Sequence, residues 1–537
     1  MVAILHRFVS AFVNRAPPWM GSFSVCLILL GVAFSAAWRA THDLEWPYDL
    51  DLFRDAAFAQ TIARGDFPDD AYYSGEQNWY NPLGPTVIAV VAKIFALEPI
   101  QIYAHHGAVI GLVVPLAIFV LAVALFGRWA GLAALFAFLF LGPHDVLPSW
   151  AAPTYSPWLF TNLLSLVPFA LTITIALRAR ENSRPITWII CGVLLGVTFL
   201  THTATAIVAG CIALVLAWGH GKPRLIALRW SLVLFSAVVV SLPFLVTIVG
   251  RYGLRIRNTA PLDFFWEETD LRNIFEFLRS TLNVGSAISC LGFIMLFTSR
   301  TTKAARSVMI AWLGVCLVLF AYGYARQAWP GAHLPGILPS FHWLFHLRLA
   351  KALLLGFGLY CALDLITSRL DRWWKLPSPV ALLFVFILFL GLQYRKISHR
   401  FDFVGARELA LSYAALPGFR ESVAWLRRET SADAVVLAPP QWALVLLGAA
   451  GRKTVIVDRP FSNPYVLFEP RAAAAGDMEM NLAGHQRDAF LEIALKYHVS
   501  YVLLADALPV FDDRRLTAPF VTPVFAQGNF AVLRIEQ

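Results

Sequence analysis

The stretch that decides the fold runs from Trp46 to Pro85 and reads WPYDLDLFRDAAFAQTIARGDFPDDAYYSGEQNWYNPLGP. It contains seven acidic residues, yet it follows an apolar run at Met20–Trp38 and precedes a long series of further apolar runs. A run of that length is typical of a membrane-spanning helix. The acidic stretch is therefore predicted to be a loop at the membrane surface, and its composition indicates a role beyond connecting two spans.

The composition supports a membrane protein. Of 537 residues, 58% are hydrophobic and 14% are charged, whereas soluble proteins average about 25% charged residues. The net charge of +9 lies mostly in short loops, which indicates membrane topology and argues against nucleic acid as a partner. The first apolar run is too long for a signal peptide, so we expect a retained helix. Six cysteines stand singly inside apolar runs, and we interpret them as buried small side chains: 26, 191, 211, 290, 316 and 361.

Eleven apolar segments are predicted to span the membrane. They are residues 20–40, 102–126, 128–142, 157–177, 186–200, 203–218, 226–249, 281–298, 307–325, 346–366 and 379–394. Segment 83–97 is the doubtful case, because it is short, has Pro82 and Pro85 at its start and contains Lys93.

The charges of the loops decide whether segment 83–97 is predicted to cross the membrane. If the N-terminus with Arg7 and Arg15 is cytoplasmic and 83–97 does not cross, the basic loops all become cytoplasmic, as the positive-inside rule expects. These loops are 127–128, 178–184, 219–224, 299–306 and 368–375. If 83–97 crosses, all of them move outside. We therefore predict a cytoplasmic N-terminus, an outer C-terminus and a segment 83–97 that lies at or re-enters the outer surface.

The residues after about 400 change character. FRESVAWLRRET and LEIALKYHV have helical periodicity, while AVVLA, KTVIVD, HVSYVLLAD and NFAVLRI are typical of strands. The predicted fold is an α-helical polytopic membrane protein of about 11 spans with a C-terminal soluble α/β domain. Residues 1–398 form the membrane domain, with its first outer loop at 42–100, and residues 399–537 form the outer domain.

The acidic loop has a pattern of its own. LFRDAAFAQTIARG predicts a short interfacial helix that ends at Gly65, with Asp49 and Asp51 just at its start. Helix capping explains any single aspartate. Seven acidic residues beside several aromatic rings and an amide are also a pattern by which proteins bind sugars. The residues concerned are Tyr72, Tyr73, Trp79, Tyr80 and Asn81.

The order of these motifs resembles the GT-C glycosyltransferases, a group that includes protein mannosyltransferases and the aminoarabinose transferase of lipid A. The matching loop pieces are DLDLFRDAAFAQTIARGDF and YNPLGP. FGRWAGLAALFAFLFLGP at 126–143 is similar to the family's third span, and FLTHTATA at 199–206 stands where the family has a short polar break. AWLRRETSADAVVLA at 424–438 is similar to the outer domain of large bacterial members.

The resemblance implies an inverting glycosyltransferase with a polyprenyl-phosphate sugar donor and a carboxylate general base. Asp51 matches the family's base best by its spacing to Gly65, and Asp49 is the second candidate. Arg54 departs from the family, in which many members have Glu or His near this place. Asp49 and Asp51 are alternatively ligands for a divalent metal, since hard cations prefer carboxylate oxygens. We find no nucleotide-cofactor motif. The substrate-pocket candidates are Arg54, Glu76, Trp79, Tyr80, Asn81, His202 and His346.

Basic residues on the predicted outer side are candidates for the donor phosphate site. They are Arg251, Arg255 and Arg257 in RYGLRIR, and Arg348 and Lys351 in FHWLFHLRLAKALLL. Arg348 and Lys351 stand three apart and share a helical face, and they resemble the family's motif for lipid phosphate. The alternative is snorkelling toward lipid headgroups.

Several histidines stand near predicted span ends. His202 and His346 are candidates for lining the substrate cavity, and a capped turn is the alternative for His202. The pairs His105–His106 and His144–Asp145 lack the spacing of a metal site.

The expected partners are the polyprenyl-phosphate sugar donor, a glycan, lipid or protein acceptor of the cell envelope, and membrane lipids, with no nucleic acid. The expected location is the plasma membrane. Two other functions stay open: an O-antigen ligase or polymerase, and a non-enzymatic transporter of polyprenyl lipids. A ligase usually has its large polar loop late in the chain. A transporter would need polar groups at mid-membrane. A structural scaffold would leave the acidic loop unexplained.

Overall fold

The computed structural model describes residues 18–142, 147–182, 184–219, 222–261, 283–298, 303–334, 338–370, 377–505 and 514–536. Arg7, Arg15, His144 and Asp145 lie outside these ranges. The chain divides into two compact units. The first comprises residues 1–42, 108–241 and 265–404, and the second comprises residues 43–107, 242–264 and 405–537. The expected domain boundary near residue 398 stays a prediction.

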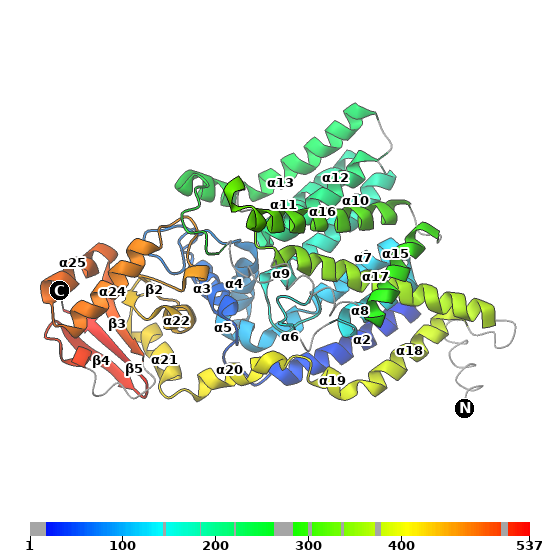
Figure 1. The fold of residues 1–537 in the computed structure, drawn as a ribbon. Helices are drawn as coiled ribbons and strands as arrows, with labels where there is room; N and C mark the ends of the chain where they lie inside the picture. Colours follow the sequence, from blue (N-terminus) through cyan, green and yellow to red (C-terminus); the bar gives the residue numbers. More distant parts are fainter. Residues whose placement is uncertain are drawn as a thin grey trace. The chain divides into compact units, whose positions relative to one another are not determined.

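The first unit is helical (Figure 1). Its main helices are α2 (Pro18–Thr41), α7 (Val113–Phe126), α8 (Arg128–Phe140), α9 (Thr161–Leu164), α10 (Leu166–Asn182), α11 (Pro185–Thr201), α12 (Thr203–Trp218), α15 (Val284–Thr298), α16 (Lys303–Ala328), α17 (Phe341–Leu370), α18 (Ser378–Leu392) and α19 (Tyr394–Ser398). Helix α13 (Pro223–Tyr252) starts in this unit and ends in the second.

The predicted membrane character is confirmed. Six helical segments are long and apolar enough to cross a bilayer: Gly21–Thr41, Pro99–Phe126, Thr161–Asn182, Pro223–Tyr252, Lys303–Arg326 and Phe341–Arg369. The other five expected spans coincide with shorter apolar helices, namely α8, α11, α12, α15 and α18. The chain is therefore a polytopic helical protein.

Three of these helices end close together in the first unit. The Phe136 ring of α8 stacks on Phe386 of α18 at 4.1 Å between centroids, and one turn later Phe140 lines a cavity together with Phe389 and Gln393, so these two helices run in the same direction. Arg39, near the end of α2, donates to the Tyr394 hydroxyl just after α18 at 3.5 Å. That segment 83–97 does not cross the membrane stays a prediction.

Glycines let helix α17 approach two neighbours closely. A Cβ at Gly356 would collide with the backbone of Ala133 and Ala134 in α8. One at Gly358 would collide with the Ile288 carbonyl oxygen in α15. Small residues at such crossings are typical of membrane helices, where packing and not the hydrophobic effect drives association.

The second unit contains most of residues 42–100, predicted to be the first outer loop, and the C-terminal residues. Its helices are α3 (Leu50–Arg64), α4 (Leu83–Phe95), α5 (Pro99–Gln101), the π-helix η1 (Ile102–His106), α20 (Ala406–Ala415), α21 (Phe419–Glu429), α22 (Pro440–Trp442), the π-helix η5 (Ala443–Leu447), α23 (Gly448–Ala450), α24 (Glu469–Ala483) and α25 (Arg487–Tyr497). Short 3₁₀ turns lie at η6 (Arg459–Phe461) and η8 (Arg514–Thr517).

A five-stranded sheet organises the C-terminal part. The strands β1 (Val435–Leu437), β2 (Lys453–Thr454), β3 (Val499–Ala505), β4 (Val521–Gln527) and β5 (Phe530–Ile535) lie in the order β2-β1-β3-β5-β4. β1 pairs in parallel with β2 and β3, whereas β5 pairs antiparallel with β3 and β4. The expected strand 453–458 is shorter than predicted, and β4 was not predicted.

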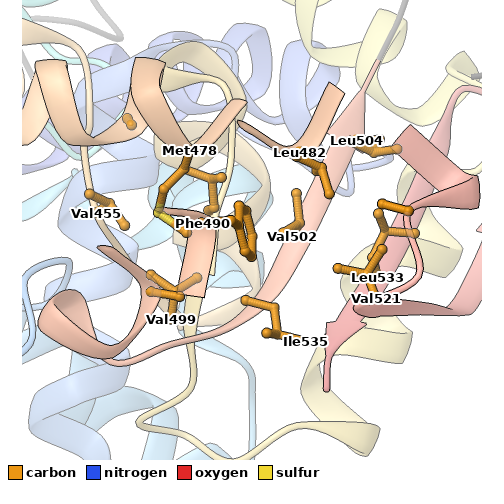
Figure 2. Close-up of a cluster of buried hydrophobic side chains, with 14 of the residues drawn as sticks. Val455, Met478, Leu482, Phe490, Val499, Val502, Leu504, Val521, Leu533 and Ile535 are labelled. Atoms are coloured by element: carbon orange, nitrogen blue, oxygen red, sulfur yellow. The ribbon is translucent and has the colours of Figure 1, made fainter. Parts of the chain in front are cut away.

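The core of this part lies between the sheet and the helices α24 and α25 (Figure 2). Met478 and Leu482 of α24 and Phe490 of α25 pack against strand residues that all point to one face of the sheet. On the other face, Trp425 of α21 contacts the rings of Tyr501 and Phe525. The predicted α/β domain is therefore present, with helices on both faces of its sheet.

Helix α3 packs directly against the C-terminal residues of its unit. Gln60 Nε2 donates to the Ala449 carbonyl at 3.0 Å, and the Phe53 ring lies 5.4 Å from Tyr413. Just before the helix, the Trp46 ring meets Phe419 at 5.0 Å. The predicted first outer loop and the C-terminal residues thus share one core.

Replacing Gly358 with valine tests the close approach of α17 to α15. The added side chain meets backbone that has no room to move, so we expect a loss of about 1–3 kcal/mol of stability. Thermal unfolding of the purified protein in detergent measures it. Gly314→Val on α16, where no atom lies within 4 Å of the added Cβ, is the control. Equal melting temperatures for the two variants would contradict the close packing of α17 against α15.

Candidate active site

The local sequence fixes both ends of helix α3. The Asp49 side chain caps the N-terminus by accepting the Asp51 backbone N–H at 2.9 Å, as N-cap aspartates do. Gly65 ends the helix in the left-handed conformation with φ +93°, and its N–H reaches the carbonyls of Ile62 and Thr61. The predicted helix and its glycine stop are thus present, and Asp51 lies in the first turn.

A charged cluster is built on this helix around Arg54. Its Nη1 lies 2.6 Å from Asp51 Oδ1, one helical turn away. Its Nε and Nη2 donate to Asp55 Oδ1 at 3.1 and 2.9 Å, and Nη2 also donates to the Tyr80 hydroxyl at 2.7 Å. One guanidinium therefore holds two carboxylates and a phenol in fixed positions, in the forked geometry that arginine favours.

Burial differs sharply within the cluster. Arg54 is 8% exposed and Asp55 1%, whereas the Asp51 side chain is 35% exposed. Among the described residues, Asp55 Oδ2 has no hydrogen-bond partner. Asp51 is thus the carboxylate of the cluster that a substrate in solution can reach, and Asp55 is a buried partner of the arginine.

Burial changes the proton affinity of the carboxyl groups near Asp51. Burial and the neighbouring Asp51 carboxylate raise the pKa of Asp49 to about 7. Burial also raises the pKa of Asp55 to about 7, although the Arg54 charge opposes this rise. Desolvation outweighs ion pairing at Asp55 because the charged form loses its water.

Aromatic rings flank the cluster. Tyr80 stacks on Phe58 at 5.7 Å between centroids, and the Arg54 guanidinium carbon lies 4.0 Å from the Tyr80 ring centre. Trp79 contacts the edges of both Phe58 and Tyr80. Trp79, Tyr80 and Asn81 are half-buried. Half-exposed rings beside carboxylates are suited to sugar binding, so the geometry agrees with the predicted pocket role of these residues, which stays a prediction.

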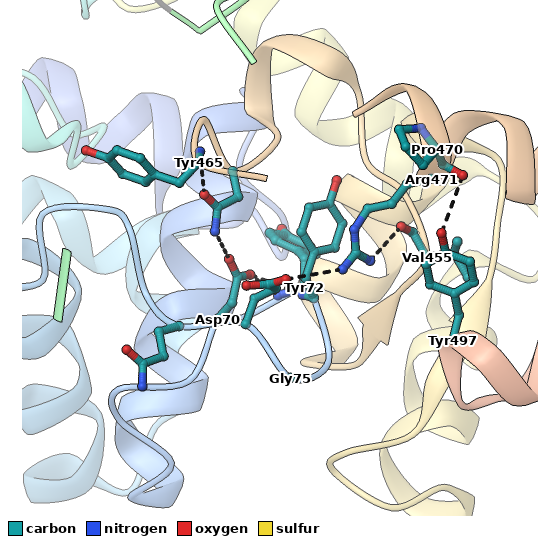
Figure 3. Close-up of polar contacts among 12 residues, drawn as sticks. Asp70, Tyr72, Gly75, Val455, Tyr465, Pro470, Arg471 and Tyr497 are labelled. Carbon is teal, nitrogen blue, oxygen red and sulfur yellow. Dashed lines mark hydrogen bonds and ion pairs between the residues drawn. The ribbon is translucent and has the colours of Figure 1, made fainter. Parts of the chain in front are cut away.

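The middle of the loop is tied to the C-terminal residues of its unit (Figure 3). Asp70 accepts the backbone N–H groups of Tyr72 and Tyr73 and the Asn463 side-chain amide. Burial raises the pKa of Asp70 to about 6. Tyr72 and Tyr73 are both buried, so they hold the loop in place and do not present open ring faces.

Glu76 belongs to the same network. It lies 3.8 Å from an Arg471 nitrogen and 3.9 Å from one of Arg251, and it accepts a hydrogen bond from the Tyr252 hydroxyl at 3.3 Å. Figure 3 shows the Arg471 side chain between the loop and Val455, whose carbonyl it also contacts. The predicted role of Glu76 in the substrate pocket stays a prediction, and its contacts assign it a part in fixing the loop.

The candidate phosphate-binding arginines after α13 lie in the second unit. Arg255 and Arg257 are exposed. The backbone N–H of Arg257 donates to the Pro464 carbonyl at 2.8 Å, and so does that of Asn258 at 2.9 Å. This segment is thus held through its backbone while its arginine side chains face solvent.

The remaining candidates lie in the first unit. His202 caps α12, and its ring lies 4.8 Å from that of His342. The buried His346 contacts the Thr205 hydroxyl at 3.3 Å through Nε2, and Thr205 also contacts the His202 ring nitrogen at 3.1 Å. The fold therefore brings these three histidines together. Their separate positions in the sequence did not predict this proximity.

Arg348 and Lys351 lie on helix α17 of the first unit, and both are half-buried. Arg348 Nη1 donates to the Ala151 carbonyl at 3.1 Å. Among the described residues, no group of three or more His, Cys, Asp or Glu side chains is arranged to hold a metal ion. The His105 ring contacts the Leu44 carbonyl at 2.9 Å, and its centre lies 4.1 Å from that of the tilted His106 ring.

Sequence reasoning missed Asp55. A usable signal was present, because Asp51 and Asp55 stand four apart with Arg54 beside them, and residues at this spacing share a helical face. It could not show that Asp55 would be buried, since burial comes from residues distant in the sequence.

The fold places the chain in a known structural class. It has the fold of the GT-C glycosyltransferases, as the sequence resemblance implied. No protein-family model matches the chain, and no curated protein sequence matches it significantly.

Three solved structures show this likeness. ArnT of Cupriavidus metallidurans in the apo state is 13% identical, with 95% of this chain and 97% of that chain covered and a TM-score of 0.55. The oligosaccharyltransferase of Archaeoglobus fulgidus with a tethered acceptor peptide is 13% identical, with 95% and 71% covered and a TM-score of 0.54. The mycobacterial arabinofuranosyltransferase AftD is 14% identical with a TM-score of 0.51, and the match covers 96% of this chain but 40% of AftD.

The raised pKa of Asp55 predicts a pH-dependent stability. The ordinary pKa is 3.8 and the folded value about 7, so the folded protein binds this proton more tightly than the unfolded chain. The stabilisation is complete at low pH and is lost as pH rises toward 7. We expect the melting temperature in detergent to fall over this range, and Asp55→Asn to reduce the fall by a few degrees. Glu421→Gln, at an exposed position, is the control. If melting temperature fell with pH as steeply in Asp55→Asn as in the wild type, the prediction would be contradicted.

Proposed function

We propose that the chain is a glycosyltransferase that moves a sugar from a polyprenyl-phosphate donor to an acceptor at the outer face of the plasma membrane, with inversion. The observation that carries the proposal is the half-exposed Asp51 carboxylate, held by Arg54 beside the rings of Trp79 and Tyr80 in a GT-C fold. One ArnT structure with a TM-score of 0.52 contains undecaprenyl phosphate, which supports a lipid-phosphate donor.

The reaction needs one base and a place for the leaving group. Asp51 takes the proton from the acceptor hydroxyl, whose oxygen attacks the anomeric carbon as the bond to the donor phosphate breaks. The phosphate leaves with the electron pair of that bond. Since it leaves as a stable anion, the base supplies most of the chemical assistance.

The contacts favour Asp51 over Asp49 as the base. One Asp49 oxygen accepts the Asp51 backbone N–H at the start of the helix and is occupied there. Asp51 is held from one side by Arg54, which orients its carboxylate. Asp49 then supports the start of the helix on which the base stands.

Arg348 and Lys351 are proposed to bind the donor phosphate. They stand three apart on α17, where half-burial strengthens the attraction for an anion. Trp79, Tyr80, Asn81 and the histidines His202 and His346 are proposed to contact the sugar or acceptor. The cell-envelope acceptor, the outer orientation and membrane-lipid contacts belong to the same proposal.

Asp51→Asn tests the base. With purified protein and a panel of radiolabelled undecaprenyl-phosphate sugars, we expect transfer to fall about 10²–10⁴-fold while donor binding is retained, because asparagine keeps the shape but cannot take a proton. Asp66→Asn, at the other end of the helix, is the control. Equal transfer by wild type and Asp51→Asn would exclude Asp51 as the base. Donor binding without transfer by the wild type would favour a transporter, and failure to bind any donor would favour a scaffold.

Paired substitutions test the phosphate site. We expect Arg348→Gln and Lys351→Gln each to weaken undecaprenyl-phosphate binding about tenfold or more, because each removes a charged hydrogen-bond donor. Arg369→Gln, an exposed position late in the same helix, serves as the reference. A similar small effect in all three variants, measured by equilibrium binding in detergent, would indicate general charge attraction and not a site.

A further inference from the structure

A cavity of about 290 Å³ lies in the first unit, and none of the residues assigned above lines it. The end of helix α8 contributes Phe140, with Leu141 and Gly142 directly after it. The end of α18 and the turns that follow contribute Phe389, Gln393, Lys396, Ile397 and Arg400. This volume is at the small end of ligand sites and suits a headgroup better than a whole lipid.

Arg400 forms a fixed wall of this cavity. It is 5% exposed, and its guanidinium donates to the Leu139 carbonyl and, at 2.8 Å, to the Thr154 hydroxyl. The Phe401 ring lies 4.9 Å below it. A buried arginine held in this way presents its charge in one orientation, so an anion that binds there need not order the side chain.

The lining combines two chemistries. Gln393, Lys396 and Arg400 all carry hydrogen-bond donors, and among the described residues that line the cavity none is acidic. Phe140, Leu141, Phe389 and Ile397 are apolar. Lys396 is exposed, whereas Arg400 is buried, so the polar side extends from the surface inward. Such a lining is complementary to a molecule with an anionic group and a hydrocarbon part.

The cavity lies at the level where membrane and water meet. It is located where the apolar helices α8 and α18 end, and α2 ends close by, at Arg39 and Tyr394. Trp38 and Tyr394 are exposed beside basic residues, the combination typical of a membrane interface. The headgroups of surrounding lipids therefore lie at the height of Lys396 and Arg400.

We propose that this cavity binds the phosphate headgroup of an anionic membrane lipid, with an acyl chain along Phe140 and Phe389. Lys396 and Arg400 contact the phosphate, and Gln393 donates to a headgroup oxygen. The site does not depend on the proposed transferase activity. The donor-phosphate candidates on α17 are not among its lining residues.

The test uses the full-length protein in neutral detergent with added phosphatidylglycerol, phosphatidylcholine or inorganic phosphate, and native mass spectrometry to count bound molecules. Phosphatidylglycerol is expected to bind in preference to phosphatidylcholine. We expect Lys396→Gln to weaken this binding about tenfold, and Arg400→Gln to abolish it if that variant folds. The matched control is Arg395→Gln, which removes an exposed charge at the adjacent position outside the cavity.

Each other outcome overturns the proposal. Equal losses of phosphatidylglycerol binding in Lys396→Gln and Arg395→Gln would mean general attraction between a basic surface and lipid. Equal binding of the two lipids in wild type would remove the role of the anionic charge. Displacement of phosphatidylglycerol by inorganic phosphate at comparable concentration would assign the cavity to a soluble phosphate compound.

Discussion

The cost of taking charge out of water governs the second unit. Ten of the fifteen residues of α3 are buried, including Arg54 and Asp55, and an unpaired buried charge is strongly destabilising. Arg54 meets this constraint by contacting Asp51, Asp55 and Tyr80 at once. Tyr80 must then lie against the helix, which fixes the end of the loop. The arrangement of the acidic loop thus follows from the need of the buried Arg54 guanidinium for charged and hydrogen-bonding partners.

The membrane part could be predicted because its determinants are local. A bilayer requires about twenty apolar residues in a row, and each expected span coincides with a helix in the described structure. Strand β4 was missed because Pro523 lies inside it. Proline is tolerated there since β4 is the edge of the sheet. The Gly528-Asn529 turn between β4 and β5 was a usable hairpin signal.

The site could be predicted only in part, because only some of its determinants are local in the sequence. Capping and a glycine stop located Asp49, Asp51 and the helix, because these effects act within a few residues. The partners of Glu76 and the burial of Asp55 depend on residues hundreds of positions away, and a sequence pattern does not specify such contacts. The comparison with solved structures supplies the fold, while the assignment of individual side chains rests on their contacts.

The contact between α3 and the C-terminal residues also sets an order of events during synthesis. Gln60 and its partner Ala449 are 389 positions apart, which a ribosome covers in about 20–80 s at typical rates. The loop emerges early, yet its packing partner is made only after every apolar helix has been translated. Until then Arg54 and Asp55 are without the core that buries them. The acidic site therefore matures last, and a prematurely terminated chain inserts its helices without assembling it.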